Sequence, residues 1–428
     1  MSKGSIIESV TAREIFSGRG HPSIEATVVT KNGAAGVAEA TAGLSVGEHE
    51  VQFAYDGGER WGGRGVMKAV NFVNGLIGPA LKGVDASNQH AVDTIMLELD
   101  GTPNKAKLGG NTTASVSAAA LKAGAASLGI PLYQHIGGAS VCLMPTPGLG
   151  ILNTIARYGG KAIHGDKPSY AFMAYGFGSF SDASYASWEM RRVYLKLLEE
   201  RFNLVNLANY RIVIPPGTVA HEREIWKVMT EAIEKSGHTG KIGIQVDVAA
   251  ATYFNKKKGV FEGLFSAEDK TREDLIQLYR DTVKQYPFIC LEDPLGEDDF
   301  EGHAILTREL GIQVVGDDLF TTNVERLKKG MAVGACNNVL LKVNQIGTIT
   351  EAFDTVRLAH SNGYGVMPCA SRGEGADIAD YAVGLATGTI RESALDATGN
   401  RLRKIEAELG SRARFAGKSG FKFGPAKV

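Results

Sequence analysis

The sequence predicts an α/β protein whose larger, C-terminal part is an α/β barrel. In the second half of the chain, short and almost entirely apolar runs alternate with amphipathic stretches of helical period. Strands that are apolar throughout are buried on both faces, as parallel strands are when helices cover both sides of a sheet. Several such strand–helix units in succession favour an α/β barrel.

The first part of the chain has a different pattern. Two β-type runs in residues 23–40 are interrupted by the sequence Lys-Asn-Gly at 31–33, which is typical of a hairpin turn. The alanine-rich segment 112–129 ends at Gly129, which predicts a closely packed helix with a glycine stop. We therefore expect a hairpin and a helix ahead of the barrel.

A stretch dense in glycine and proline, residues 137–150, separates these two patterns. We place the domain boundary there. The expected organisation is an N-terminal domain over residues 1–140 and a barrel domain over residues 141–428.

Composition limits the possible partners. The chain has 428 residues, of which 44% are hydrophobic and 22% charged, and its net charge is −1. The absence of long like-charged runs argues against nucleic acid or a membrane surface as a partner. No apolar run has the roughly 20 residues that a membrane span requires, and the N-terminus lacks the apolar stretch of a signal peptide. We expect a cytoplasmic protein that acts on a small molecule.

Four of the predicted strands are followed at once by a charged residue: Asp247, Glu292, Asp317 and Lys342. The last three are spaced by 25 residues, which suits one β-α unit and hence neighbouring strands. The C-terminal strand ends of an α/β barrel form its active-site face. Three carboxylates that meet there require a cation, and hard oxygen ligands predict Mg²⁺.

Lys342 has a chemical role in this arrangement. A nearby divalent cation lowers the pKa of a lysine, so that Lys342 can act as a general base. The alternative interpretation is that these four residues are caps and partners in loop salt bridges.

The same strand ends carry the motifs of a known family. The stretches "CLEDPLGEDDF", "GDDLFTTN" and "LLKVNQIGT" resemble the enolase signatures "SIEDPxxEDDW", "GDDLxVTN" and "LLKVNQIGT". Other stretches, among them "AREIFSGRGHPSIE", "LDGTPNKAKLGGN" and "KIEAELG", extend the resemblance over residues 5–415. It implies an N-terminal α+β domain, a modified α/β barrel, Mg²⁺, and a lysine base that removes the α-proton of a phosphorylated hydroxy acid.

The resemblance also implies roles for individual residues. Asp247, Glu292 and Asp317 match the three ligands of the Mg²⁺ that binds the substrate carboxylate, and Lys342 matches the base. In the lid loop "AGLSVGEHE", Ser45 matches a serine that helps to hold a second Mg²⁺, and His49 is a candidate substrate-side residue.

The departures from the family pattern concern the acid groups that help hydroxide to leave. The stretch that matches the family's "GDEGG" has no acidic residue, and Arg211 stands near the place of its glutamate. Ala171 replaces the partner glutamate of "QEFMI", and Arg157 falls at the histidine of "NGGxHA". The lost acids and the gained arginines predict a substrate-binding site of altered charge.

The phosphate-binding segment allows two alignments. "CASRGEGAD" matches the family's "SHRSGETED" without a gap if Ser371 takes the place of the arginine, whereas a shift of one residue gives that place to Arg372. Both stay open at this point. Arg391 replaces the lysine of "GQIKTG", and its planar, forked guanidinium is not equivalent to an ammonium group.

These observations favour an enolase-family, Mg²⁺-dependent lyase that forms an enediolate from an anionic carboxylate and has a changed substrate or leaving group. The first alternative is phosphopyruvate hydratase, which converts 2-phosphoglycerate to phosphoenolpyruvate in glycolysis. The second is a non-catalytic binding protein built on the same fold. By resemblance, the chain forms a homodimer or a higher homo-oligomer.

Overall fold

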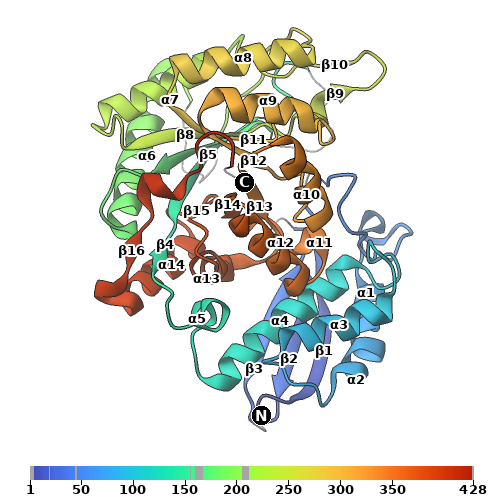
Figure 1. Cartoon of the computed structure of the whole chain (residues 1–428). Coiled ribbons are helices and arrows are strands. Elements are labelled where there is room, and N and C mark those ends of the chain that lie inside the picture. The colour runs from blue at the N-terminus through green and yellow to red at the C-terminus, as the bar shows by residue number, and fades with distance from the viewer. Residues whose placement is uncertain are drawn as a thin grey trace.

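The computed structural model describes residues 4–18, 20–43, 46–154, 156–159, 167–204 and 212–426. An N-terminal sheet with its helices lies against a larger barrel, as Figure 1 shows. Among the described residues, no helix is long and apolar enough to cross a membrane.

The N-terminal domain is built on a three-stranded antiparallel sheet of β1 (Ile7–Phe16), β2 (Pro22–Thr30) and β3 (Ala35–Ala40). The turn between β2 and β3 confirms the predicted hairpin. The predicted helix is also confirmed, as α4 (Gly110–Leu128), which ends at Gly129 in the left-handed conformation. The smaller helices beside it are α1 (Met67–Phe72), α2 (Gly78–Leu81), α3 (Gln89–Asp100) and α5 (Leu132–Gly137).

Helix α4 approaches the sheet closely because small residues face each other. A Cβ atom added at Gly36 of β3 would lie 2.1 Å from the carbonyl oxygen of Ala119. Only glycine fits there. This contact explains the alanine-rich composition that the sequence shows in this segment.

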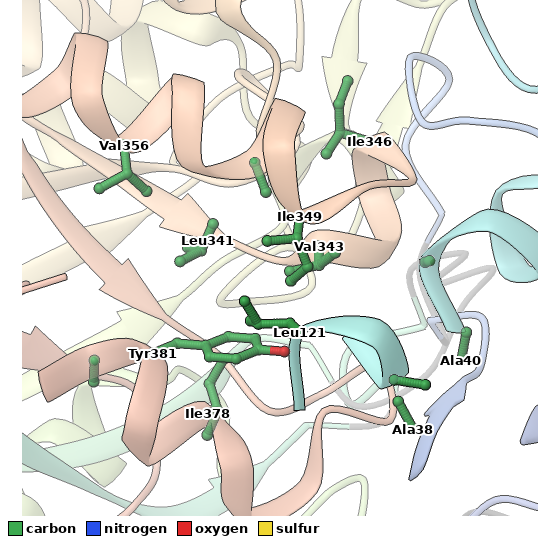
Figure 2. Packing of buried hydrophobic residues seen from close by; sticks show 14 of the residues in the cluster. Ala38, Ala40, Leu121, Leu341, Val343, Ile346, Ile349, Val356, Ile378 and Tyr381 are labelled. Carbon is green, nitrogen blue, oxygen red and sulfur yellow. The ribbon is translucent and has the colours of Figure 1, made fainter. Parts of the chain in front are cut away.

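One hydrophobic core joins the two domains. Figure 2 shows Leu121 of α4 close to Val343, Ile349 and Tyr381, which belong to the barrel domain. All four side chains are buried in the same cluster. The N-terminal domain is therefore packed firmly over one end of the barrel rather than tethered to it.

The barrel sheet has the strand order β14-β13-β12-β11-β8-β6-β5-β15. A single bridge between Val366 and Gly388 links the outermost strands, so that the sheet curls into a ring of eight. The strands are β5 (Thr146–Asn153), β6 (Ser169–Ala174), β8 (Ile242–Asp247), β11 (Phe288–Glu292), β12 (Gln313–Gly316), β13 (Asn338–Leu341), β14 (Gly365–Pro368) and β15 (Thr389–Ile390).

The expected parallel pairing is confirmed for the five strands from β8 to β14. Strand β6 departs from it, because it runs antiparallel to both of its neighbours, β5 and β8. Short strands outside the ring are β4 (Leu143–Met144), β7 (Ile212–Val213), β9 (Phe254–Asn255), β10 (Val260–Phe261) and β16 (Arg414–Phe415).

Helices surround the ring, as Figure 1 shows. They are α6 (Phe180–Phe202), α7 (Arg223–Lys235), α8 (Arg272–Gln285), α9 (Phe300–Leu310), α10 (Val324–Val333), α11 (Val343–Ile346), α12 (Ile349–Ser361), α13 (Ile378–Gly384) and α14 (Ala397–Leu409). Together with the N-terminal sheet they form the α/β architecture, a barrel preceded by a smaller α+β part, that the sequence predicts.

Alternate residues of the strands face the inside and the outside of the ring. Met173 of β6 packs with Cys290 and Leu340 in the inner cluster, whereas Tyr170 of β6 packs with the surrounding helices. Because side chains alternate along a strand, Ser169 and Ala171 face the interior with Met173. This alternation determines which residues of β6 face the interior of the barrel.

Candidate active site

The charged strand-end residues lie at one end of the ring, as predicted. Asp247 ends β8 and Glu292 ends β11, and the two are partners in the parallel register. Asp317 directly follows β12, and Lys342 directly follows β13. All four side chains are buried.

Arg391, directly after β15, joins two of these carboxylates. Its Nη1 lies 3.2 Å from Oε1 of Glu292, and its Nη2 donates a hydrogen bond to Oδ2 of Asp247. Nη2 also donates to Oγ of Ser169, at 3.0 Å. Because β15 and β11 stand opposite each other in the ring, Arg391 spans the interior of the barrel.

Lys342 forms an ion pair with the remaining carboxylate. Its Nζ donates to Oδ2 of Asp317, while Nε2 of Gln345 donates to Oδ1 at 2.8 Å. Burial raises the pKa of Asp317, but the charge of Lys342 outweighs this and lowers the pKa to about 2.

The pKa of Lys342 differs from the sequence-based expectation. Burial by itself lowers the pKa of this ammonium group, but the carboxylate of Asp317 raises it above the ordinary value. The expected lowering depends on a cation beside the lysine, and here its neighbour is an anion.

Lys167 is a member of the site that sequence reasoning missed. Its Nζ pairs with Oδ2 of Asp247, and its side chain is largely buried. Burial and the nearby charges of Arg391 and Lys342 lower the pKa of Lys167 to about 7. Lys167 lies on the loop before β6, in a segment where no motif marks it, so that only the fold identifies it.

Asp317 also belongs to a second cluster of acidic residues, in addition to the predicted metal ligands. Among the described residues, Asp293, Asp317 and Asp318 form the cluster whose carboxylate oxygens lie within 4.8 Å of one another. The carboxylate of Asp293 accepts hydrogen bonds from the backbone N–H groups of Asp317 and Asp318, at 3.0 and 2.7 Å. Asp293 therefore has a visible structural role in holding the turn after β12.

The described end of the lid loop, residues 46–50, contacts the barrel domain. Nε2 of His49 lies 3.1 Å from the carboxylate of Asp298, in the loop after β11. Glu50 receives both terminal nitrogens of Arg372 in a buried, bidentate ion pair. The structure thus ties Arg372 to the N-terminal domain.

A cavity of about 360 Å³ lies beside these groups, between the N-terminal sheet and the mouth of the barrel. Ser371, Arg391 and Glu392 line it from the barrel side, and Glu39 and Thr41 from the N-terminal domain. Ser371 and Arg391 are therefore brought together at one cavity, with Arg372 next to Ser371 but facing Glu50.

Arg157 is not brought to this cavity. Its Nε lies 3.2 Å from Oε1 of Glu222, and both side chains are fully buried. Tyr170, which faces the helices rather than the barrel interior, donates a hydrogen bond to Glu222 at 3.0 Å. Arg157 is therefore engaged behind β6. The two remaining candidates, Ser45 and Arg211, lie outside the described residues.

Carboxylates, a lysine and an arginine gathered at the C-terminal strand ends of an α/β barrel define the active-site face of a barrel enzyme. The family is shown by comparison with known proteins. Residues 7–136 match the model "Enolase, N-terminal domain", and residues 143–423 match "Enolase, C-terminal TIM barrel domain". The chain belongs to the enolase family.

Curated relatives agree along the whole length. The chain is 41% identical to an enolase of Methanocaldococcus jannaschii over 96% of this chain and 97% of the relative. It is also 41% identical to an enolase of Methanopyrus kandleri, over 97% and 99%. The protein is therefore an enzyme, a carbon–oxygen lyase of the enolase family.

Proposed function

We propose that the protein is a phosphopyruvate hydratase that removes water from 2-phosphoglycerate. The main support for this proposal is the full-length similarity to proteins named enolase, together with a buried lysine beside strand-end carboxylates. The sequence analysis favoured a changed substrate or leaving group. The relatives support the alternative, phosphopyruvate hydratase, better than a lyase with a changed substrate or leaving group.

The proposed metal is Mg²⁺, held by Asp247, Glu292 and Asp317. These residues offer buried, hard oxygen donors, and Oε1 of Glu292 accepts no hydrogen bond and has Nη1 of Arg391 as its ion-pair partner at 3.2 Å. The chemistry of these donors suits the ion, while their oxygens are paired here with Arg391, Lys167 and Lys342 rather than gathered within 4.8 Å of one another. Asp293 is a weaker candidate ligand, because backbone N–H groups already occupy both of its oxygens. When bound, Mg²⁺ would stabilise the negative charge that develops on the substrate carboxylate.

The residues of this chain divide the remaining work. Lys342, as the neutral amine, takes the α-proton in the proposed reaction, and Asp317 orients its Nζ. Ser371 and Arg391 face the cavity that would receive the phosphorylated carboxylate. The lid segment with His49 and Glu50, packed over this end of the barrel, limits the access of water.

A second candidate shares the first step and differs in the leaving group. Its basis is Ala171, which stands where the resemblance places a glutamate, together with Arg391 in place of a lysine. Loss of a stable anion such as phosphate needs no acid, whereas loss of hydroxide does.

One assay separates the two candidates. Purified protein is incubated with Mg²⁺ and 2-phosphoglycerate in deuterated buffer, and both enol product and α-proton exchange are followed by NMR. Formation of phosphoenolpyruvate supports the hydratase. Exchange without product supports the changed leaving group, and Lys342→Ala is the inactive control. The cytoplasmic location and the homodimer stay predictions, the second testable by light scattering.

A further inference from the structure

Glu392, the residue after Arg391, has a side chain that the reaction described so far does not use. It lines the same cavity as Arg391 and is 14% exposed. Its Oε1 lies 3.7 Å from Nη2 of Arg391, the nitrogen that binds Asp247 and Ser169. The carboxyl group of Glu392 is thus linked to the strand-end carboxylates Asp247 and Glu292 through the guanidinium of Arg391.

The backbone is shaped to deliver this side chain. Glu392 has a φ of 51°, in the left-handed region that residues with a Cβ atom adopt at a cost. The N–H groups of Ser393 and Ala394 both donate to the carbonyl oxygen of Gly148, at 2.7 and 3.1 Å. The chain after β15 is therefore fastened along β5.

The side chain of Glu392 occupies space inside the barrel that small residues leave free. A Cβ atom added at Gly150 of β5 would lie 2.9 Å from Cδ of Glu392 and 3.3 Å from its Oε1. Gly150 is the register partner of Ala171 on β6. Residues paired in this way lie side by side on one face, so Gly150 and Ala171 leave room together, and Glu392 enters that room.

Ala171 is the position at which the resemblance expects a glutamate. The small residues at 150 and 171 and the acidic residue at 392 thus form one arrangement, in which a carboxyl group reaches the same space from a different strand. Glu392 packs against Gly150 of β5, and β5 stands three places from β13, the strand that precedes Lys342, in the ring of eight. Glu392 and Lys342 therefore approach the interior from different sides of the ring.

We propose that Glu392 is the general acid of this enzyme. This assignment rests on the proposed dehydration. In the step, the α-proton passes to Lys342, the C–H electron pair becomes the new C=C bond, and the bond to the β-hydroxyl breaks. The Glu392 carboxyl gives its proton to the departing oxygen, so that one water leaves and Glu392 remains as a carboxylate.

The test separates proton removal from elimination. In Glu392→Gln, formation of phosphoenolpyruvate from 2-phosphoglycerate should fall by about 10²–10⁴-fold, the usual contribution of a general acid. Exchange of the α-proton with deuterated solvent should continue at close to the wild-type rate, because Lys342 is untouched. Glu301→Gln, an exposed glutamate of α9, is the matched control.

A relocation variant strengthens the test. The double variant Ala171→Glu with Glu392→Ala moves the carboxyl group from residue 392 to β6. It should recover part of the activity that Glu392→Ala alone loses. Glu392→Asp keeps the charge beside Arg391 and serves as the folded variant if Glu392→Gln does not fold. It should still lose elimination more than exchange.

Three results would overturn the assignment. Unchanged product formation in Glu392→Gln and Glu392→Asp would show that the carboxyl is not the acid. A parallel loss of exchange and elimination would show a structural role. If wild-type protein exchanges the α-proton but forms no phosphoenolpyruvate, the proposed dehydration itself fails and the acid role fails with it.

Discussion

The guanidinium of Arg391 lies 3.2 Å from the carboxylate of Glu292, on the strand that stands opposite across the barrel. The same guanidinium binds Asp247, so that one arginine compensates two of the three proposed metal ligands. Lys167 and Lys342 supply further positive charges next to these carboxylates. Metal binding must therefore compete with cations of the protein itself.

The two acidic groups that share Asp317 can be distinguished by metal titration. Glu292→Gln should weaken Mg²⁺ binding by at least about 10-fold. Even substitutions of residues that only support metal ligands lower metal affinity by about 10–100-fold. Asp318→Asn should have little effect, because Asp318 is not in the proposed set. Calorimetry measures both affinities. Normal binding in Glu292→Gln with weak binding in Asp318→Asn would assign the metal to Asp293, Asp317 and Asp318 instead.

Arg391→Ala should make the stability of the fold depend on Mg²⁺. The substitution leaves the buried carboxylates of Asp247 and Glu292 without their arginine, which should cost about 3–5 kcal/mol of unfolding free energy in the presence of a chelator. Mg²⁺ should recover part of that loss, because it binds only the folded site. Thermal melts with chelator and with Mg²⁺ measure the difference. An equal loss in both conditions would argue against a metal at these two residues.

Lys342→Arg keeps the charge beside Asp317 but removes the base. A guanidinium does not give up its proton in this pH range, so α-proton exchange should be abolished while the protein remains folded. NMR of the exchange reaction, with the melting temperature as control, provides the measurement. A folded Lys342→Arg protein that exchanges at the wild-type rate would exclude Lys342 as the base.

The Arg157–Glu222 pair predicts a structural effect. Both side chains are fully buried, so Arg157→Met should destabilise the fold by about 3–5 kcal/mol, since it leaves an unpaired buried carboxylate. Arg157→Met combined with Glu222→Gln should recover much of the loss. Urea unfolding measures the free energies. A raised KM with unchanged stability in Arg157→Met would instead support the substrate-binding role.

The pH dependence of stability should include a contribution from His221. Burial, with Arg223 and Lys270 nearby, lowers its pKa to about 4 from the ordinary 6.5. The unfolded chain therefore binds this proton first, and the contribution to stability is lost as the pH falls from about 6.5 to 4. Nδ1 of His221 also accepts a hydrogen bond from the N–H of Arg223 at 3.0 Å, which protonation would break.

His221→Asn keeps a hydrogen-bond acceptor and removes the titration. The variant should lose less stability than the wild type when urea unfolding at pH 7 is compared with unfolding at pH 5. An identical loss in both proteins would mean that other groups determine the acid sensitivity.

Much of the fold follows from local sequence pattern. Strand β8 and its partners up to β14 are largely apolar and buried, as strands covered by helices are, and a charged residue marks the point where each of β8, β11, β12 and β13 ends. Gly129 and the turn at 31–33 mark the end of a helix and a hairpin by backbone preference alone. Periodicity of this kind cannot reveal strand direction, so the antiparallel course of β6 emerged only with the pairing of β5, β6 and β8.

The sequence by itself determined the family, the barrel, and the places of Lys342 and the three carboxylates at the strand ends, because each of these is written in a contiguous stretch of the chain. Only the tertiary structure decided what surrounds them. It turned Arg157 toward Glu222, brought Lys167 to Asp247, and placed Glu392 in the space beside Gly150 and Ala171. The physical reason is that these contacts join residues far apart in the chain, and the closing of the ring sets which side chains meet.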